Sequence, residues 1–257
     1  MFKQKVFFEN TSFNATTDFY NTTFEKEAIF NKATFNDIVV FDKTSFNYRP
    51  NFLYTSFYDL AVLRETEFKN GINLAYINLR DKGCLALYNE TIGNMSNNSR
   101  EDQETFRILK NEAQRKNDSI KAIDYYQKEC ESHRNSLSWF KNSTVENFSN
   151  KFVLSYEKII SNYGTSVPKS LFWIIYFNFL CFVYFLYTYS SLNFNFDYCT
   201  LKLTINGFFN SIIPGVFYGE DSFYKNASGV FKSIHLLGNV LLIYELQKSF
   251  RKYSRRL

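Results

Sequence analysis

Residues 13–46 read FNATTDFYNTTFEKEAIFNKATFNDIVVFDKTSF, and phenylalanine recurs there at alternating steps of six and five residues. The same steps continue in both directions, and every anchor position from 2 to 85 holds Phe or Leu. The anchors are Phe2, Phe8, Phe13, Phe19, Phe24, Phe30, Phe35, Phe41, Phe46, Phe52, Phe57, Leu63, Phe68, Leu74, Leu79 and Leu85. The period is therefore eleven residues, with two large apolar anchors in each period.

Neither regular secondary structure brings these anchors to one face. An α-helix turns by about 100° per residue, so a step of five advances about 140° and a step of six about 240°, which gives two separated stripes. In a flat strand a step of five reverses the face, whereas a step of six keeps it. A chain that turns a corner after each short segment directs every anchor to one axis. The pattern therefore predicts a solenoid.

A second register supports this prediction. The position two residues before each anchor, from Phe13 onward, holds a small or compact residue. These residues are Thr11, Thr17, Thr22, Ala28, Ala33, Val39, Thr44, Pro50, Thr55, Ala61 and Thr66, followed by the less regular Ile72, Ile77 and Gly83. One large and one small inward position suit a narrow core that side chains fill completely. The residues between anchors are mostly Asn, Asp, Glu and Lys, as expected of an exterior.

Over residues 6–90 the chain resembles the pentapeptide-repeat family, in the variant whose units alternate five and six residues around F-x-x-(A/T)-x-F. The resemblance implies a right-handed, four-sided (quadrilateral) β-helix of roughly four coils, with neighbouring coils about 4.8 Å apart. It also implies that the repeat residues are scaffold. Because a solenoid exposes unpaired strand edges at its ends, we expect the irregular units at 70–90 to meet a cap formed by the residues that follow.

Some members of that family mimic DNA and bind topoisomerases, a role that implies a strongly acidic surface. Residues 1–90 hold ten Lys or Arg and eleven Asp or Glu, a net charge of −1. The sequence therefore disfavours a DNA mimic.

Residues 99–134 have a different character and predict helices. Ser99 followed by Asp102 is a typical helix start, with acidic residues in the first turn. One apolar stripe comprises Phe106, Leu109 and Ala113, and a second comprises Ile120, Ile123, Tyr126 and Cys130. Asn117–Asp118 lies between the stripes, so we expect an antiparallel helical hairpin over 99–140, with one continuous helix as the alternative.

Residues 171–189, LFWIIYFNFLCFVYFLYTY, contain no charge. As a helix they extend about 28 Å, close to the thickness of the hydrocarbon region of a bilayer. Trp173 lies near one end, and Tyr187 and Tyr189 near the other, as in the aromatic belts of membrane proteins. We predict a transmembrane helix over about 171–190, in which Asn178 makes a helix–helix contact.

A second apolar segment, over about 230–247, is interrupted by His235 and Asn239 and ends near Glu245. The basic tail 248–257 follows it directly, carries a charge of +5 and accounts for the net charge of the whole chain. Alone, the segment could be interfacial. The tail favours a second span by the positive-inside rule, and it is expected to contact anionic lipid headgroups at about 1 kcal/mol per basic residue.

Basic residues thus lie before the first span and after the second, and few lie in the connecting residues 190–229. The N-terminus shows no secretory signal. We therefore expect a multi-pass protein with both termini cytoplasmic, in the inner membrane of a bacterium.

The approach to the first span, NYGTSVP at 162–168, resembles an N/G-Y-G-x-S-x-P motif of the same family, which in some relatives continues as a two-helix pore similar to potassium channels. Residues 208–221, FFNSIIPGVFYGED, are the candidate re-entrant pore-like loop, in which Tyr218-Gly219-Glu220 aligns with the Tyr-Gly-Asp end of such filters. Phe217 stands where the first filter glycine belongs, and Pro214 interrupts the preceding run. A degenerate ion-channel-like membrane protein is therefore the alternative function.

No pattern of enzyme chemistry is present. His133 and His235 lie outside any metal or Ser/His spacing, no Gly-rich phosphate loop follows a strand, and the four cysteines form no CxxC pair. We predict no catalytic, cofactor-binding or metal-binding residue and no cofactor. Nucleic acid is not expected as a partner, because the membrane explains the basic tail better.

The leading prediction is a membrane-anchored, non-enzymatic pentapeptide-repeat protein whose cytoplasmic solenoid is a structural or protein-interaction module. The sequence leaves open which protein binds the solenoid and whether the chain self-associates. The expected regions are a β-helix at 1–92, a helical hairpin or cap at 99–140, a linker and juxtamembrane segment at 141–168, and a membrane module at 169–257.

Overall fold

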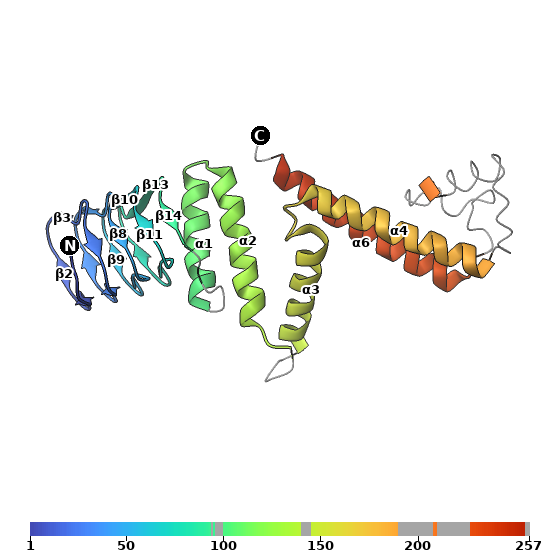
Figure 1. The fold of residues 1–257 in the computed structure, drawn as a ribbon, viewed down its shortest axis with the longest axis horizontal. Coiled ribbons are helices and arrows are strands. Elements are labelled where there is room, and N and C mark those ends of the chain that lie inside the picture. Colours follow the sequence, from blue (N-terminus) through green and yellow to red (C-terminus); the bar gives the residue numbers. More distant parts are fainter. Residues whose placement is uncertain (94, 96–99, 140–144, 190–207, 210–226, 255–257) are drawn as a thin grey trace. The chain divides into compact units, whose positions relative to one another are not determined.

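The computed structural model describes residues 1–93, 95, 100–139, 145–189, 208–209 and 227–254 (Figure 1). The chain forms two compact units, Met1–Phe152 and Val153–Leu257.

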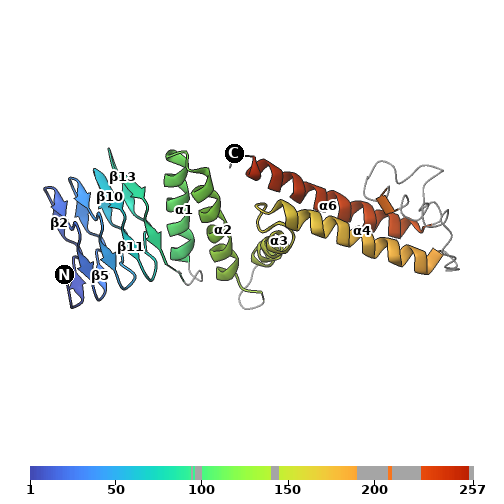
Figure 2. The same ribbon diagram turned by 45° about the horizontal axis from the view of Figure 1, so that its top comes forward.

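The first unit begins with a parallel β-solenoid of about four turns (Figure 2). Its strands are β1 (Val6–Phe7), β2 (Ser12–Phe13), β3 (Thr17–Asp18), β4 (Thr23–Phe24), β5 (Ala28–Ile29), β6 (Thr34–Phe35), β7 (Val39–Val40), β8 (Ser45–Phe46), β9 (Ser56–Phe57), β10 (Leu60–Arg64), β11 (Glu67–Phe68), β12 (Asn78–Leu79), β13 (Cys84–Tyr88) and β14 (Thr91–Ile92). They stack in sheets of order β2-β6-β9-β12, β3-β7-β10-β13, β4-β8-β11-β14 and β1-β5. Bridges from Ile29 through Asn51 to Asn73 continue the fourth side. The predicted four-sided solenoid is confirmed.

The aromatic anchors form the core of this solenoid. Phe13 pairs with Phe35 and Phe35 with Phe57, so one turn takes two of the eleven-residue periods. Equivalent rings lie over one another: the centroids of Phe30 and Phe52 are 4.8 Å apart and their planes differ by 4°. Every anchor from Phe24 to Phe57 is at most 2% exposed. The register predicted for these anchors is therefore correct.

The small inward position also carries a hydrogen bond that residue size alone does not predict. The buried hydroxyls of three threonines donate to the carbonyl oxygens of anchors in the preceding turn. The pairs are Thr44 to Phe19 at 2.8 Å, Thr55 to Phe30 at 2.7 Å and Thr66 to Phe41 at 2.8 Å. Because these threonines follow one another every eleven residues, they link successive turns through side chains as well as through the backbone.

Every eleventh residue takes a left-handed backbone conformation at a corner of the solenoid. The residues with positive φ are Asn10, Asn21, Lys32, Lys43, Tyr54, Glu65 and Tyr76. Each lies in a tight turn, such as the one closed by the Ala33 N–H donating to the Phe30 carbonyl at 2.9 Å. Residues other than Gly and Asn rarely adopt this conformation. The stacked turns therefore hold residues such as Lys32, Lys43 and Glu65 in a left-handed backbone conformation that is unfavourable for them.

The periodic register ends one anchor earlier than predicted. Leu79 still pairs with Phe57, but Leu85 pairs with Ala61, and Leu87 rather than Leu85 pairs with the anchor Leu63. Two extra residues enter at the turn Arg80–Gly83, where the Gly83 N–H donates to the Arg80 carbonyl at 2.6 Å. The prediction of Leu85 as an anchor is therefore wrong: Leu85 is buried in the position that small residues hold in earlier turns.

Helices α1 (Arg100–Arg115) and α2 (Ser119–Ser136) follow the last turn and lie side by side (Figure 1). Asp118 caps α2 by accepting the Lys121 N–H at 3.0 Å, so the chain breaks where the sequence predicted. The predicted stripe of α1, Phe106, Leu109 and Ala113, joins the solenoid core.

Polar contacts also connect these helices to the open end of the solenoid. The Leu74 N–H donates to the Thr105 hydroxyl at 3.0 Å, and Asp102, fully buried, accepts from Arg49 at 2.6 Å. Glu90 accepts from Lys121 at 2.7 Å and from the Tyr125 hydroxyl at 3.2 Å. Burial, together with the negative charge of Glu90, raises the pKa of the Tyr125 phenol. The helices therefore cap the solenoid, as the irregular last units led us to expect.

The second predicted stripe is wrong. Ile120 is 66% exposed, and the buried residues of α2 are Ala122, Tyr125 and Ser132. Two of these are small, which lets the helix axes approach closely, while Glu129 on the same face bonds to Lys110 of α1 at 2.7 Å. Small and polar side chains thus form the contact instead of the larger aliphatic ones.

Three further helices are described: α3 (Val145–Ser161), α4 (Val167–Tyr189) and α6 (Gly229–Tyr253). Helix α3 occupies most of the segment predicted as a linker at 141–168. Helix α4 begins four residues before the predicted span, and α6 continues into the basic tail. Both α4 and α6 are long and apolar enough to cross a membrane. They lie antiparallel along each other, and in both views they remain side by side (Figures 1 and 2).

Candidate functional site

The α4–α6 pair has apolar side chains on its outside and polar ones between its helices. Only 22% and 28% of the positions in the two candidate spans are buried. The exposed side chains include Phe172, Ile175, Phe179, Leu180, Ile234, Leu237 and Leu241. The buried ones include Asn178, His235, Asn239 and Glu245. A core helix of a soluble protein would have the opposite distribution.

Three of the buried polar residues form an interhelical cluster. The Asn178 Oδ1 lies 2.9 Å from the His235 Nε2, and the Asn178 side-chain amide donates to Asn239 at 2.7 Å. Each of the three residues is at most 1% exposed. A Cβ added to Gly238 would lie 2.3 Å from the Phe177 ring, so glycine allows the helices to approach at this level. The contact predicted for Asn178 is confirmed, and its partners come from α6.

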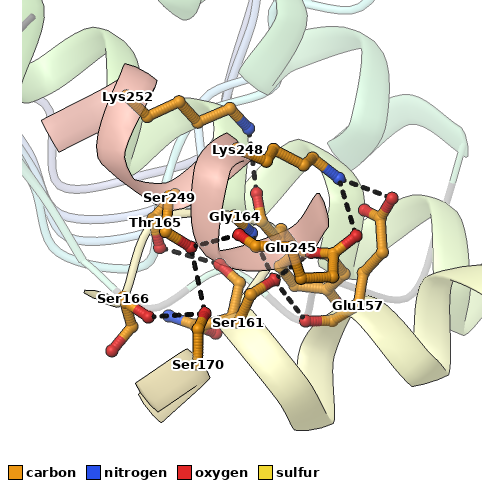
Figure 3. A network of polar contacts seen from close by, with 12 residues as sticks. Glu157, Ser161, Gly164, Thr165, Ser166, Ser170, Glu245, Lys248, Ser249 and Lys252 are labelled. Carbon is orange, nitrogen blue, oxygen red and sulfur yellow. Dashed lines mark hydrogen bonds and ion pairs between the residues drawn. The ribbon is translucent and has the colours of Figure 1, made fainter. Parts of the chain in front are cut away.

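A larger polar network lies where α3, α4 and the end of α6 meet (Figure 3). We call it the juxtamembrane network. It comprises Glu157, Ser161, Gly164, Thr165, Ser166, Ser170, Glu245, Lys248, Ser249 and Lys252. All of these residues belong to the second compact unit.

The carboxylate of Glu245 is at the centre of this network and is 3% exposed. It accepts the Ser161 hydroxyl at 2.5 Å, while the Lys248 ammonium lies 2.5 Å from Glu157 and 3.8 Å from Glu245. Burial and the negative charge of Glu245 raise the pKa of the nearby Tyr156 phenol. One ammonium and one hydroxyl thus stabilise two carboxylates, and both carboxylates become anchoring points between α3 and α6.

The NYG part of the sequence motif forms the turn that joins α3 to α4. Asn162, Tyr163 and Gly164 have φ values of 52°, 60° and 71°, so three consecutive residues are left-handed. The Gly164 N–H donates to the Ser161 hydroxyl at 2.7 Å, and the Lys252 ammonium donates to the Tyr163 carbonyl at 2.8 Å. A Cβ on Gly164 would lie 2.7 Å from the Lys248 side chain. Asn162 and Tyr163 are not glycine, so their left-handed backbone is strained. The hydrogen bond from Lys252 of α6 helps to offset this strain.

Small side chains complete the site. The hydroxyls of Ser170 and Ser249, both fully buried, lie 3.2 Å apart and join the first turns of α4 to the last turns of α6. The sequence singled out the motif at 162–168, but it gave Ser161 and Ser249 no role. It assigned Lys248 to the basic tail expected to contact lipid headgroups, whereas the structure pairs Lys248 with Glu157 and Glu245. The only sequence signal for Ser161 and Ser249 is the unusual presence of Glu245 next to an apolar run.

Within the described residues no three His, Cys, Asp or Glu side chains gather as a metal site requires. Phe208 and Phe209 are described, but the rest of the candidate pore-like loop lies outside the described residues. The hydrogen bonds and ion pairs of the juxtamembrane network connect α3, α4 and α6.

On the solenoid, a shallow groove of about 550 Å³ runs along the side that carries Ile29, Asn51 and Asn73, with Tyr48 and Arg49 at its edge. Arg49 is already engaged by Asp102 and Asn73 by Glu101, so the groove presents the amides of Asn51 and Asn70 together with the Glu27 carboxylate, which pairs with Lys5.

Residues 1–45 match the family model described as Pentapeptide repeats (9 copies). These residues are pentapeptide repeats. The match ends at residue 45, but the same strand register continues to β12, so the repeat architecture extends beyond the matched segment. Comparisons with curated proteins and with solved structures find no match for this chain. No relative therefore supports the resemblance of the membrane module at 169–257 to a channel module.

Proposed function

We propose that this chain is a membrane-anchored, non-enzymatic repeat protein, in which the pentapeptide-repeat solenoid and its helical cap form a structural or protein-interaction module. A solenoid with two candidate membrane helices fits a structural repeat module. The observation that carries membrane anchoring is the inside-out character of the α4–α6 pair: Asn178 and His235 are buried between helices whose outer surface is Phe, Ile, Leu and Val. Such a surface is stable in lipid and costly in water.

In this proposal α4 and α6 cross the inner membrane of a bacterium as a hairpin, with both termini in the cytoplasm. Lys158 and Lys169 lie at the same end of the pair as Arg251 and Lys252, because the Lys252 ammonium reaches the Tyr163 carbonyl. Basic residues at one end of two antiparallel spans favour the cytoplasmic side for that end.

Reporter fusions test this topology. A periplasm-active reporter at residue 210 and a cytoplasm-active reporter after residue 257 should both give signal, and exchanging the two reporters should abolish both signals. A cytoplasmic signal from residue 210 contradicts the hairpin. Release of the full chain from membranes by carbonate would contradict anchoring altogether.

The interaction role rests on the solenoid surface, which is nearly neutral over residues 1–90 and carries the groove next to Tyr48. Proximity labelling from the N-terminus of the full chain identifies neighbours. The same labelling with Tyr48→Ala tests the groove, and Tyr20→Ala, which removes an exposed tyrosine elsewhere on the solenoid, is its control. A neighbour lost with the first variant only supports an interaction module. Unchanged labelling with both variants contradicts a role for this groove.

A further inference from the structure

Helix α3 carries an apolar stripe that remains exposed, although the Trp139 ring contacts Phe148. Val145, Phe148, Phe152 and Ile159 follow one another at spacings of three, four and seven residues. At about 100° per residue they fall within roughly 60° of one another around the helix. Their exposed fractions are 87%, 43%, 59% and 51%. Helix α3 therefore has an exposed apolar face, which we call the α3 stripe.

This stripe is distinct from the face through which α3 contacts the α4–α6 pair. Tyr156 and Ile160 pack with Ile174 and Leu242, and Glu157 and Ser161 enter the juxtamembrane network. That packing face is already occupied. The stripe lies beside that face: Tyr156 is next to the stripe, whereas Ile160, Glu157 and Ser161 lie further round the helix. The packing of α3 on the pair leaves the four stripe residues exposed.

The end of α3 lies at the level expected for the membrane interface. The Trp173 indole N–H donates to the Ile159 carbonyl at 2.9 Å. Trp173 lies six residues into α4, about 9 Å from its start. Tryptophan prefers the boundary between headgroups and hydrocarbon, and on this basis Ile159 lies at that boundary too.

The polar residues beside the stripe fit an interfacial helix. Lys151 and Lys158 lie seven residues apart on one margin of the stripe, and the segment contains no acidic residue on that margin. Trp139 packs edge-to-face against Phe148 with ring centroids 5.7 Å apart, which adds a second amphipathic ring near the start of α3. Aromatic and aliphatic side chains bordered by lysines are typical of helices that lie in the plane of a membrane surface.

We propose that α3 lies in the headgroup region of the bilayer, with Phe148, Phe152 and Ile159 immersed among the acyl chains and its lysines near lipid phosphates. This inference rests on the proposed membrane anchoring and adds a third membrane contact to the two spans. The lipid surface is the occupant chosen because the stripe is continuous, at Ile159, with the lipid-facing side of α4.

Depth-dependent quenching in the full chain tests the proposal. Cys84, Cys130, Cys181 and Cys199 are replaced by Ser, and single cysteines are introduced by Phe152→Cys, Asn150→Cys or Leu180→Cys. Each is labelled with an environment-sensitive fluorophore in nanodiscs of phosphatidylcholine and phosphatidylglycerol.

Lipids with a spin label near the headgroup should quench the label at 152. They should leave the label at 150, on the opposite face, largely unquenched. Leu180, in the middle of α4, should be quenched only by spin labels deep in the chains.

The outcomes separate the two proposals. If the label at 180 is quenched by lipid and the label at 152 is not, the α3 inference is wrong while membrane anchoring stands. If neither label is quenched, both are wrong. Equal quenching at 150 and 152 also contradicts an ordered interfacial helix. Because Phe152→Cys removes a large side chain, Ile159→Cys repeats the comparison about two turns further on. The label at 159 should be quenched as the label at 152 is, and much more strongly than the label at 150.

Discussion

In the solenoid the least exposed side chains are phenylalanines such as Phe30 and Phe41, whereas in the α4–α6 pair they include Asn178, His235 and Asn239. The solenoid exterior is made of Asn, Lys, Asp and Glu, and the exterior of the pair is made of Phe, Leu, Ile and Val. Both regions bury what their surroundings would solvate poorly. The difference is the one that the proposed membrane anchoring predicts, with water around the solenoid and lipid around the pair.

The largest expected effect tests the aromatic ladder. Phe30→Ala removes a fully buried ring that stacks on Phe8 and Phe52, and should destabilise the solenoid by about 3–5 kcal/mol. Tyr20→Ala removes a ring that is 53% exposed and should cost less than about 1 kcal/mol. Urea denaturation of the full chain in detergent, followed by the loss of β-sheet circular dichroism, measures both. Similar losses of unfolding free energy in the two variants would contradict the inward orientation of the Phe anchors.

The next effect tests the solvent outside α4. Leu180→Lys should reduce membrane insertion by about 2.5–3.5 kcal/mol, since Leu180 is 48% exposed near the middle of the span. Tyr76→Lys changes a side chain of similar exposure on the solenoid and should alter stability by at most about 1 kcal/mol. Membrane-integrated protein is quantified after carbonate extraction. Full integration of the Leu180 variant would indicate that this face does not contact lipid.

A smaller effect is expected at the left-handed turn of the juxtamembrane network. Gly164→Ala places a Cβ at φ +71° against Lys248, and should destabilise the contact of α3 with the pair by about 1–2 kcal/mol. Gly229→Ala, where a Cβ meets nothing within 4 Å, is the matched control and should be neutral or slightly stabilising. Thermal unfolding in detergent compares the two. A neutral Gly164 variant would mean that the turn relaxes without loss.

The smallest effect concerns the threonine hydroxyls that link solenoid turns. Thr55→Val keeps the side-chain shape but removes a hydrogen bond to the Phe30 carbonyl, so we expect a loss of about 1 kcal/mol. The hydroxyl of Thr17 donates only to the nearby Ala15 carbonyl at 3.1 Å, so Thr17→Val should change stability less. Chemical denaturation reveals the difference. Stabilisation by Thr55→Val would show that the inward position selects for size and apolarity alone.

The solenoid was predictable because its information is local and repeated. Each Phe-anchored unit encodes the same turn of the chain, so the period remains recognisable despite individual exceptions such as Ala33 at a threonine position. The apolar run of α4 is likewise readable, since twenty or so residues without charge satisfy the length of a span. The buried face of α2 could not be predicted from the sequence. Burial of Ala122 and Ser132 rather than Ile120 depends on how closely α1 approaches α2.

The sequence by itself determined the eleven-residue period, the large and small inward positions, the break at Asn117–Asp118 and the two apolar segments, because each is a pattern within consecutive residues. Only the tertiary structure decided where the register slips at Arg80–Gly83, and it alone brought Ser161 to Glu245 and Asn178 to His235. These contacts join residues far apart in the chain and occur once each. A contact that is neither local nor repeated leaves no period in the sequence, and its energy depends on a geometry that the whole fold supplies.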